Sequence, residues 1–210
     1  MGEYIPLVAR LIIIEGAYNT GTDHLLKGLG EKGYPTITAV KLSPLGKDER
    51  LAINEWVAQT ESQIHSHKQS REEAIRLSEG FRAGVAFMEG SLLRIAARSK
   101  LIAFRLTTVQ DFNRQAQALA MATRSQRKFN PSGVEGIIFM EEPLRQRGNS
   151  PVYNYSQAET RILQRTIREL IPEQIPLLSL NANQASIPEL ITRVENFMYY
   201  KIPGLARALT

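Results

Sequence analysis

Short runs of apolar residues alternate along the chain with longer segments in which apolar residues recur every three or four positions. The first apolar run, residues 11–14 within 7–15, is β-branched and short, which is typical of a strand buried on both faces. Residues 23–32 then show helical spacing, and Gly33 supplies a usual helix stop. The chain is therefore predicted to open with a strand, a turn and a helix.

The same pattern continues to the end of the chain. It predicts four further strands, at residues 36–42, 101–106, 134–140 and 176–180. Helices are predicted at about residues 48–64, 71–98, 109–127, 158–170 and 187–200. The helix at 71–98 rests on five apolar residues at steps of three or four, namely Ala74, Leu77, Phe81, Val85 and Met88. Ser186 with Glu189 predicts a capping box at the start of the last helix.

Strands alternating with amphipathic helices predict βαβ units, and therefore a three-layer α/β fold. We expect a parallel sheet of about five strands flanked by helices. The length of 210 residues fits a single domain over residues 1–210, with a polar loop at about 143–157 and a peripheral tail at about 203–210. In such sheets ligands bind at the carboxyl ends of the strands, so the first strand-to-helix turn is the place to look for a site.

The amino-acid composition excludes several kinds of chemistry and partner. Hydrophobic residues make up 43% and charged residues 22%, as in ordinary globular proteins, and the absence of cysteine excludes disulfides and thiolate chemistry. The net charge of +5 suits an anionic ligand, but the basic residues are scattered, so nucleic acid is not expected as a partner. Glu3, Arg10 and Glu15 interrupt the apolar start that a signal peptide needs. We expect cytoplasmic residence and no membrane partner.

The first turn carries a candidate phosphate-binding loop. Gly16 and Gly21 have the spacing of the two glycines in GxxxxGK[ST], between a predicted strand and a predicted helix. Backbone N–H groups of such a loop and the start of the following helix bind phosphate. The candidate phosphate-binding residues are Gly16, Tyr18, Asn19, Thr20, Gly21, Thr22 and Asp23. A plain glycine turn is the alternative.

Two positions of this loop depart from the pattern. Thr22 stands where the lysine is expected, and Asp23 replaces the hydroxyl that binds magnesium. Asp23 is a candidate oxygen ligand for Mg²⁺, although its negative charge is unfavourable beside a polyphosphate.

Several segments in the right order resemble thymidylate kinase. The sequence IIIEGAYNTGTDHLLKGLGEKGY resembles the opening of that family, VEGIIFMEEP a later strand, and SLNANQASIPELITRVENF the last strand and helix. The resemblance covers about residues 10–200. It implies a P-loop kinase fold, transfer of the ATP γ-phosphoryl group to thymidine monophosphate with Mg²⁺, and a homodimer.

The resemblance also implies site residues. Pro44 lies in the counterpart of an Arg-x-Pro segment, and Arg82 and Arg105 match arginines of the substrate site. In LIAFRLTTVQDF, Arg105 would end a strand, with Phe104 in place of the family's aspartate. Arg145 and Arg147 fall in the counterpart of the lid and, with Arg105, are the candidate catalytic residues.

The missing lysine and aspartate leave activity open. Phosphoryl transfer depends on positioning and on neutralising charge, which these residues serve. The leading interpretation is a nucleotide-binding protein resembling thymidylate kinase, with ATP and Mg²⁺ as cofactors if it is an active phosphotransferase. The alternative is a non-catalytic P-loop kinase-fold protein kept for an interaction or structural role. A basic module associated with nucleic acid is a third, weaker interpretation.

Overall fold

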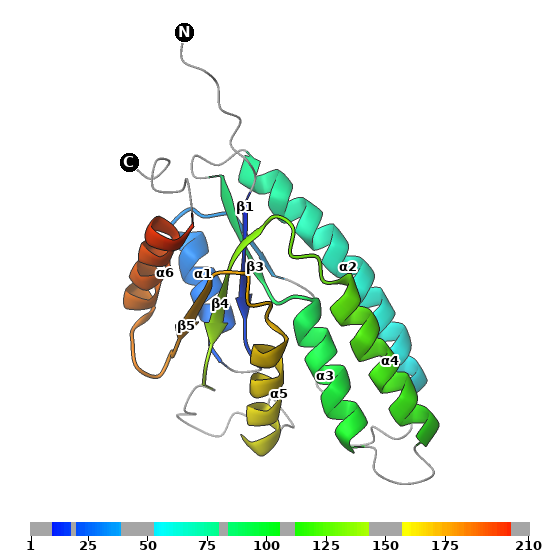
Figure 1. Ribbon diagram of the computed structural model, residues 1–210. Helices are drawn as coiled ribbons and strands as arrows, with labels where there is room; N and C mark the ends of the chain where they lie inside the picture. The colour runs from blue at the N-terminus through cyan, green and yellow to red at the C-terminus, as the bar shows by residue number, and fades with distance from the viewer. Residues whose placement is uncertain are drawn as a thin grey trace.

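A parallel five-stranded sheet lies between two layers of helices (Figure 1). The computed structural model describes residues 10–17, 20–38, 53–79, 84–105, 112–142 and 157–202. The strands are β1 (Arg10–Glu15), β2 (Thr36–Thr38), β3 (Val85–Glu89), β4 (Val134–Met140) and β5 (Leu177–Leu180). Their order is β2-β3-β1-β4-β5, and every neighbouring pair is parallel. The predicted fold class and strand number are confirmed.

The helices divide between the two faces of the sheet. They are α1 (Thr22–Glu31), α2 (Ile53–Glu79), α3 (Leu92–Arg105), α4 (Phe112–Lys128), α5 (Gln157–Leu170) and α6 (Ile187–Lys201). Helices α1 and α6 pack on one face, and α2, α3 and α5 pack on the other (Figure 1). Helix α4 lies outside α3 and α2, where a separate apolar cluster joins the three helices.

Strand β1 shows why the sheet is buried on both faces. Leu11 and Ile13 belong to the cluster under α2, α3 and α5, whereas Ile12 and Ile14 belong to the cluster under α1 and α6. All four side chains are at most 1% exposed. Since side chains of a strand alternate between faces, a central strand covered on both sides must be apolar at every position. The continuous run of residues 11–14 is therefore the signature of a central parallel strand.

Helix α1 approaches α6 closely at Gly28. A Cβ atom added to Gly28 would lie 2.7 Å from Ile187 Cγ2 and 2.9 Å from Ile191 Cδ1. The missing side chain therefore sets the distance between the two helices that cover this face. At the start of α6, the Ser186 and Glu189 capping box predicted from the sequence is present.

Two predicted elements are wrong. The helix predicted at 71–98 is instead the end of α2, the strand β3 and the start of α3. The strand predicted at 101–106 is wrong because residues up to Arg105 continue α3, which is apolar on two sides since it packs against both the sheet and α4. The loop at about 143–156 and the tail at 203–210 lie outside the described residues.

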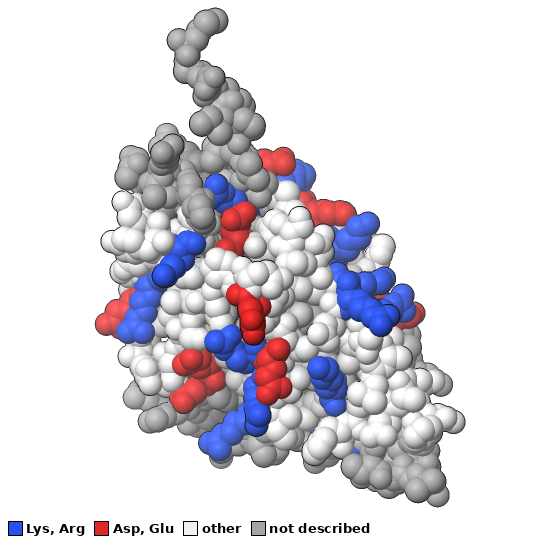
Figure 2. All heavy atoms as spheres, viewed as in Figure 1, with Lys and Arg blue, Asp and Glu red and all other residues white. Residues whose placement is uncertain are grey.

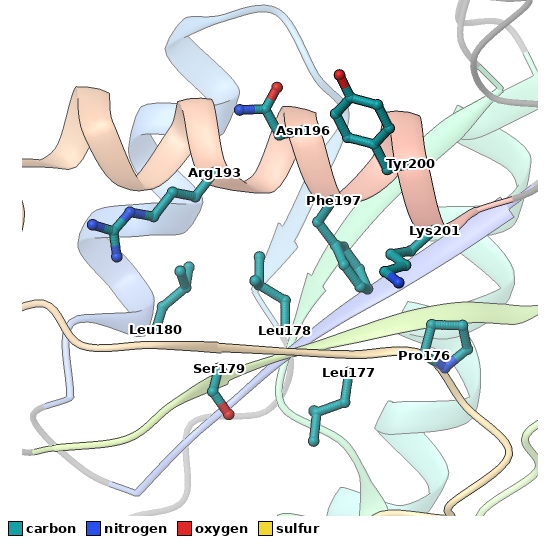
Figure 3. Close-up of a pocket in the computed structure, with 10 residues that line it drawn as sticks. All are labelled: Pro176, Leu177, Leu178, Ser179, Leu180, Arg193, Asn196, Phe197, Tyr200 and Lys201. Atoms are coloured by element: carbon teal, nitrogen blue, oxygen red, sulfur yellow. The ribbon is translucent and has the colours of Figure 1, made fainter.

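On the surface in Figure 2, Lys and Arg alternate with Asp and Glu, so that face shows no broad patch of one sign. No helix among the described residues is long and apolar enough to cross a membrane. A groove of about 630 Å³ lies between edge strand β5 and α6 (Figure 3), lined by Pro176, Leu177, Leu178, Ser179, Leu180, Arg193, Asn196, Phe197, Tyr200 and Lys201. None of these residues comes from the turn after β1.

Candidate functional site

The turn between β1 and α1 lies where the direction of the chain through the sheet switches. From β1 the chain crosses by α1 to β2 at one edge, whereas from β4 it crosses by α5 to β5 at the other edge. Helices α1 and α5 lie on opposite faces. Such a switch point opens a crevice at the carboxyl ends of the strands, and ligands of open α/β sheets bind there.

The turn is tightly closed by side chains. A Cβ atom on Gly16 would lie 2.5 Å from Thr20 Oγ1 and 3.1 Å from Met140 Cβ, so the turn needs glycine here. Thr20 is fully buried, and its hydroxyl donates a hydrogen bond of 2.8 Å to the Ala17 carbonyl. The Ala17 N–H donates to the side-chain oxygen of Gln164, which reaches the turn from α5.

The first turn of α1 presents free backbone donors. Gly21 precedes the helix in the left-handed conformation, with φ of 84°, and the Leu25 N–H is bonded to the Gly21 carbonyl at 3.0 Å. Within the described part of the chain, the N–H groups of residues 21–24 have no hydrogen-bond acceptor. Free N–H groups at the positive end of a helix dipole are suited to an anion.

A cluster of charged side chains lies beside these donors, at the end of β3. The Thr22 hydroxyl donates to Glu89 Oε1 at 2.8 Å, and the Arg94 Nη1 atom lies 3.2 Å from the same oxygen. Arg94 Nε also lies 3.5 Å from Glu15 Oε2. Glu15 is fully buried, and the side chains of Glu89 and Arg94 are each 14% exposed. The cluster thus joins the carboxyl ends of β1 and β3 to the start of α1.

The charge of this cluster is not positive. Burial raises the pKa of Glu15, and the nearby positive charge of Arg94 offsets this only in part. With Glu15 protonated, the charges of Glu89 and Arg94 balance; with Glu15 ionised, the cluster carries one negative charge. Thr22 adds no charge where a lysine would neutralise phosphate oxygens. Within the part of the chain that the structure describes, the turn can therefore hold an anion by hydrogen bonds, with little help from fixed cations.

Comparison with known proteins identifies the fold. No protein-family model matches the sequence, and no curated protein matches it. Among solved structures, a thymidylate kinase from Candida albicans is 12% identical, with a TM-score of 0.55, and the match covers 90% of this chain and 91% of that one. A deoxyadenosine kinase from M. mycoides, solved with bound dATP, is also 12% identical with a TM-score of 0.55, over 90% of this chain and 98% of that one. The chain has a P-loop kinase fold.

In this P-loop kinase fold the side chain of the candidate magnesium ligand, Asp23, is largely exposed. The Asp23 side chain is 74% exposed and lies 3.2 Å from the ring of His24. Among the described residues, no three His, Asp or Glu side chains come together. Mg²⁺ at a nucleotide is usually held by one or two carboxylates together with phosphates, so Asp23 as a magnesium ligand stays a prediction. The two acids that do approach the start of α1 are Glu15 and Glu89, neither of which was predicted as a site residue.

Arg105 does not end a strand. It lies in the last turn of α3, 13 residues after Leu92, and a helix rises about 1.5 Å per residue, so the two ends are roughly 20 Å apart. The prediction that placed Arg105 at the carboxyl edge of the sheet fails with the strand on which it rested. Arg82 lies outside the described residues, and Val85 begins β3 three positions later.

Some of the remaining predicted site residues lie in the described turn, and the others lie outside the described residues. Gly16, Thr20, Gly21 and Thr22 form the turn as expected, although Thr20 closes it. Those outside the described residues are Tyr18, Asn19, Pro44, Arg145 and Arg147.

Glu15, Glu89, Arg94 and Gln164 were not predicted as site residues from the sequence. One signal was available, because the Ile-Glu-Gly at residues 14–16 is matched by Met-Glu-Gly at 88–90. Both triplets follow short apolar runs, and both end central strands. For Gln164, a polar residue in an amphipathic helix, we find no sequence signal that separates it from other polar residues of α5.

Proposed function

We propose that the chain is a nucleotide-binding protein that holds a phosphate group at the start of α1 and transfers phosphoryl groups slowly, if at all. The observation that carries this proposal is the set of N–H groups at residues 21–24, which have no acceptor among the described residues and lie at the switch point of a P-loop kinase fold. Backbone donors at a helix start bind phosphate without any side chain.

The charge of the site supports slow transfer. Phosphoryl transfer requires cations that neutralise the oxygens of the moving group. Here Thr22 replaces the lysine, its hydroxyl is engaged by Glu89, and Arg94 is already paired with two carboxylates. Losing one electrostatic donor costs about 10²- to 10³-fold in comparable sites. If the chain does transfer phosphoryl groups, ATP with Mg²⁺ is the donor that the resemblance to thymidylate kinase implies; a homodimer and cytoplasmic residence also stay predictions from the sequence.

One observation favours a non-catalytic role instead. Thr20 and Gln164 satisfy both backbone groups of Ala17 and close the turn on itself. A turn whose backbone is bonded by the protein's own side chains suits a fold kept for interaction. The two proposals differ in whether nucleotides bind, and the test below separates them.

The test is calorimetric titration with ADP, ATP, thymidine monophosphate and dATP, followed by a coupled assay of phosphoryl transfer. Gly16→Ala should abolish nucleotide binding, because its Cβ atom would meet Thr20 Oγ1 at 2.5 Å and distort the turn. Gly30→Ala is the matched control: it lies in α1, and its Cβ atom would meet only Thr36, at 3.2 Å.

Nucleotide binding by the wild type and by Gly30→Ala, with none by Gly16→Ala, would support the proposal. An absence of binding for all four nucleotides would overturn it and favour the non-catalytic role. Binding that Gly16→Ala leaves unchanged would locate the nucleotide elsewhere.

A further inference from the structure

The side chain of Gln164 is buried with half of its amide unused. Gln164 lies in α5 and is 6% exposed. Its oxygen accepts the Ala17 N–H, whereas its Nε2 group has no hydrogen-bond partner among the residues that the structure describes. The orientation of the amide is fixed by chemistry, because a backbone N–H can donate only to the oxygen. The free donor is therefore the NH₂ group.

A buried donor without a partner is unusual. Burying an amide N–H without an acceptor costs free energy, so nearly all buried polar groups in folded proteins are paired. The Nε2 atom is bonded to the same carbon as the oxygen that holds Ala17, so it lies beside the turn. Its missing acceptor points to a ligand at the turn.

A second set of unpaired donors belongs to the same turn. The backbone N–H groups of residues 21–24 lack acceptors within the described residues, at the start of a helix of 10 residues. Gly21 and Thr22 are buried there. Two independent elements, α1 and α5, thus bring free N–H donors to one turn without bringing a cation.

We propose that Gln164 is a phosphate-binding residue, whose Nε2 group donates to the phosphate held by the start of α1. This inference rests on the nucleotide binding proposed above and adds a neutral donor from α5 to that site. Since the donors that the described residues bring to this site are uncharged and Glu89 lies close by, these residues hold a phosphate group of a nucleotide chiefly by hydrogen bonding.

The test separates the role of the side-chain oxygen of Gln164 from the role of its NH₂ group. Gln164→Glu keeps an oxygen for the Ala17 N–H but replaces the donor with a carboxylate. Gln164→Met removes both functions and keeps the length of the side chain. Gln117→Glu, at an exposed position of α4, is the control for the change in net charge. Each variant is titrated with ADP and, as the ligand without phosphate, with adenosine, after thermal melting shows that it is folded.

We expect Gln164→Glu and Gln164→Met to weaken ADP binding about tenfold or more, the loss typical of a hydrogen bond to a charged group. Adenosine binding, and all binding by Gln117→Glu, should stay unchanged. If Gln164→Glu binds ADP as the wild type does, Gln164 is only an acceptor for Ala17, and this inference fails while the proposed function stands. If Gln164→Glu does not fold, Gln164→Met decides by the same comparison. If the wild type does not bind ADP, both proposals fall.

Discussion

Replacing Thr22 by lysine tests whether the missing cation limits this site. Thr22 is 6% exposed, and its hydroxyl lies 2.8 Å from Glu89 Oε1. A lysine at this position would therefore start within reach of Glu89, and only its flexible end would extend toward a phosphate bound at the start of α1. The structure makes Glu89 the competitor for the new charge, whereas Asp23 points to solvent.

The attraction of the new ammonium group to Glu89 is comparable in size to its attraction to a bound phosphate. Two unit charges 4 Å apart interact by about 4 kcal/mol at an effective dielectric constant of 20. An ammonium group that binds Glu89 gives up most of that attraction to a phosphate. We therefore expect Thr22→Lys alone to raise phosphoryl transfer by about tenfold or less, and Thr22→Lys with Glu89→Gln to raise it by about 10²- to 10³-fold.

The assay is phosphoryl transfer from ATP to thymidine monophosphate with Mg²⁺, measured for both variants, for Glu89→Gln alone and for the wild type. ADP titration of the same four proteins shows whether a gain arises in binding or in turnover. A wild-type rate typical of kinases, with no gain in either lysine variant, would refute this reasoning, because another group would then supply the charge.

Three further predictions concern stability. Burial lowers the pKa of His67 to about 4 from 6.5, so the folded protein binds fewer protons than the unfolded chain between these pH values. The free energy of unfolding, measured in urea, should therefore rise by about 3 kcal/mol as the pH rises from 4 to 6.5. His67→Leu should remove this rise. Burial raises the pKa of Glu15 above 4.5, so the ionisation of Glu15 should lower the stability of the wild type as the pH rises above 4.5, by at most about 1.4 kcal/mol per pH unit. Glu15→Gln should remove this loss. Equal urea midpoints for Glu15→Gln and the wild type at pH 8 would contradict this. Gly28→Ala should destabilise the protein by about 1–3 kcal/mol, because its Cβ atom would overlap Ile187 and Ile191, and an unchanged melting temperature would show that α1 and α6 separate freely.

Helices and strands that are bounded by turn or capping residues in the sequence were predicted well. The bounds of β4 match the prediction because the turn at residues 130–133 precedes an apolar run, and α6 begins where its capping box indicates. The position of the turn between β1 and α1 was also predictable, since Gly16 and Gly21 carry their spacing in the sequence; phosphate binding by this turn stays a prediction.

Strand β3 could not be predicted from periodicity. All but the last of its five residues are buried, so the strand has no polar alternation, and Val85 and Met88 happen to continue the helical spacing of α2. The better signal was the pair Gly84 and Gly90, which bracket β3 with positive φ angles. Because β3 was read as helix, the acid at its end was missed. The contact of Gln164 with the turn depends on tertiary packing of α5, which no local pattern records.

The central position of β1 has a consequence for synthesis of the chain. During synthesis β1 leaves the ribosome before both of its partners, β3, about 75 residues later, and β4, about 125 residues later. Until β4 is made, β1 presents an open apolar edge, and such edges recruit other chains. A nascent chain arrested before residue 134 should therefore be prone to aggregation, because one edge of β1 stays open until β4 has been made.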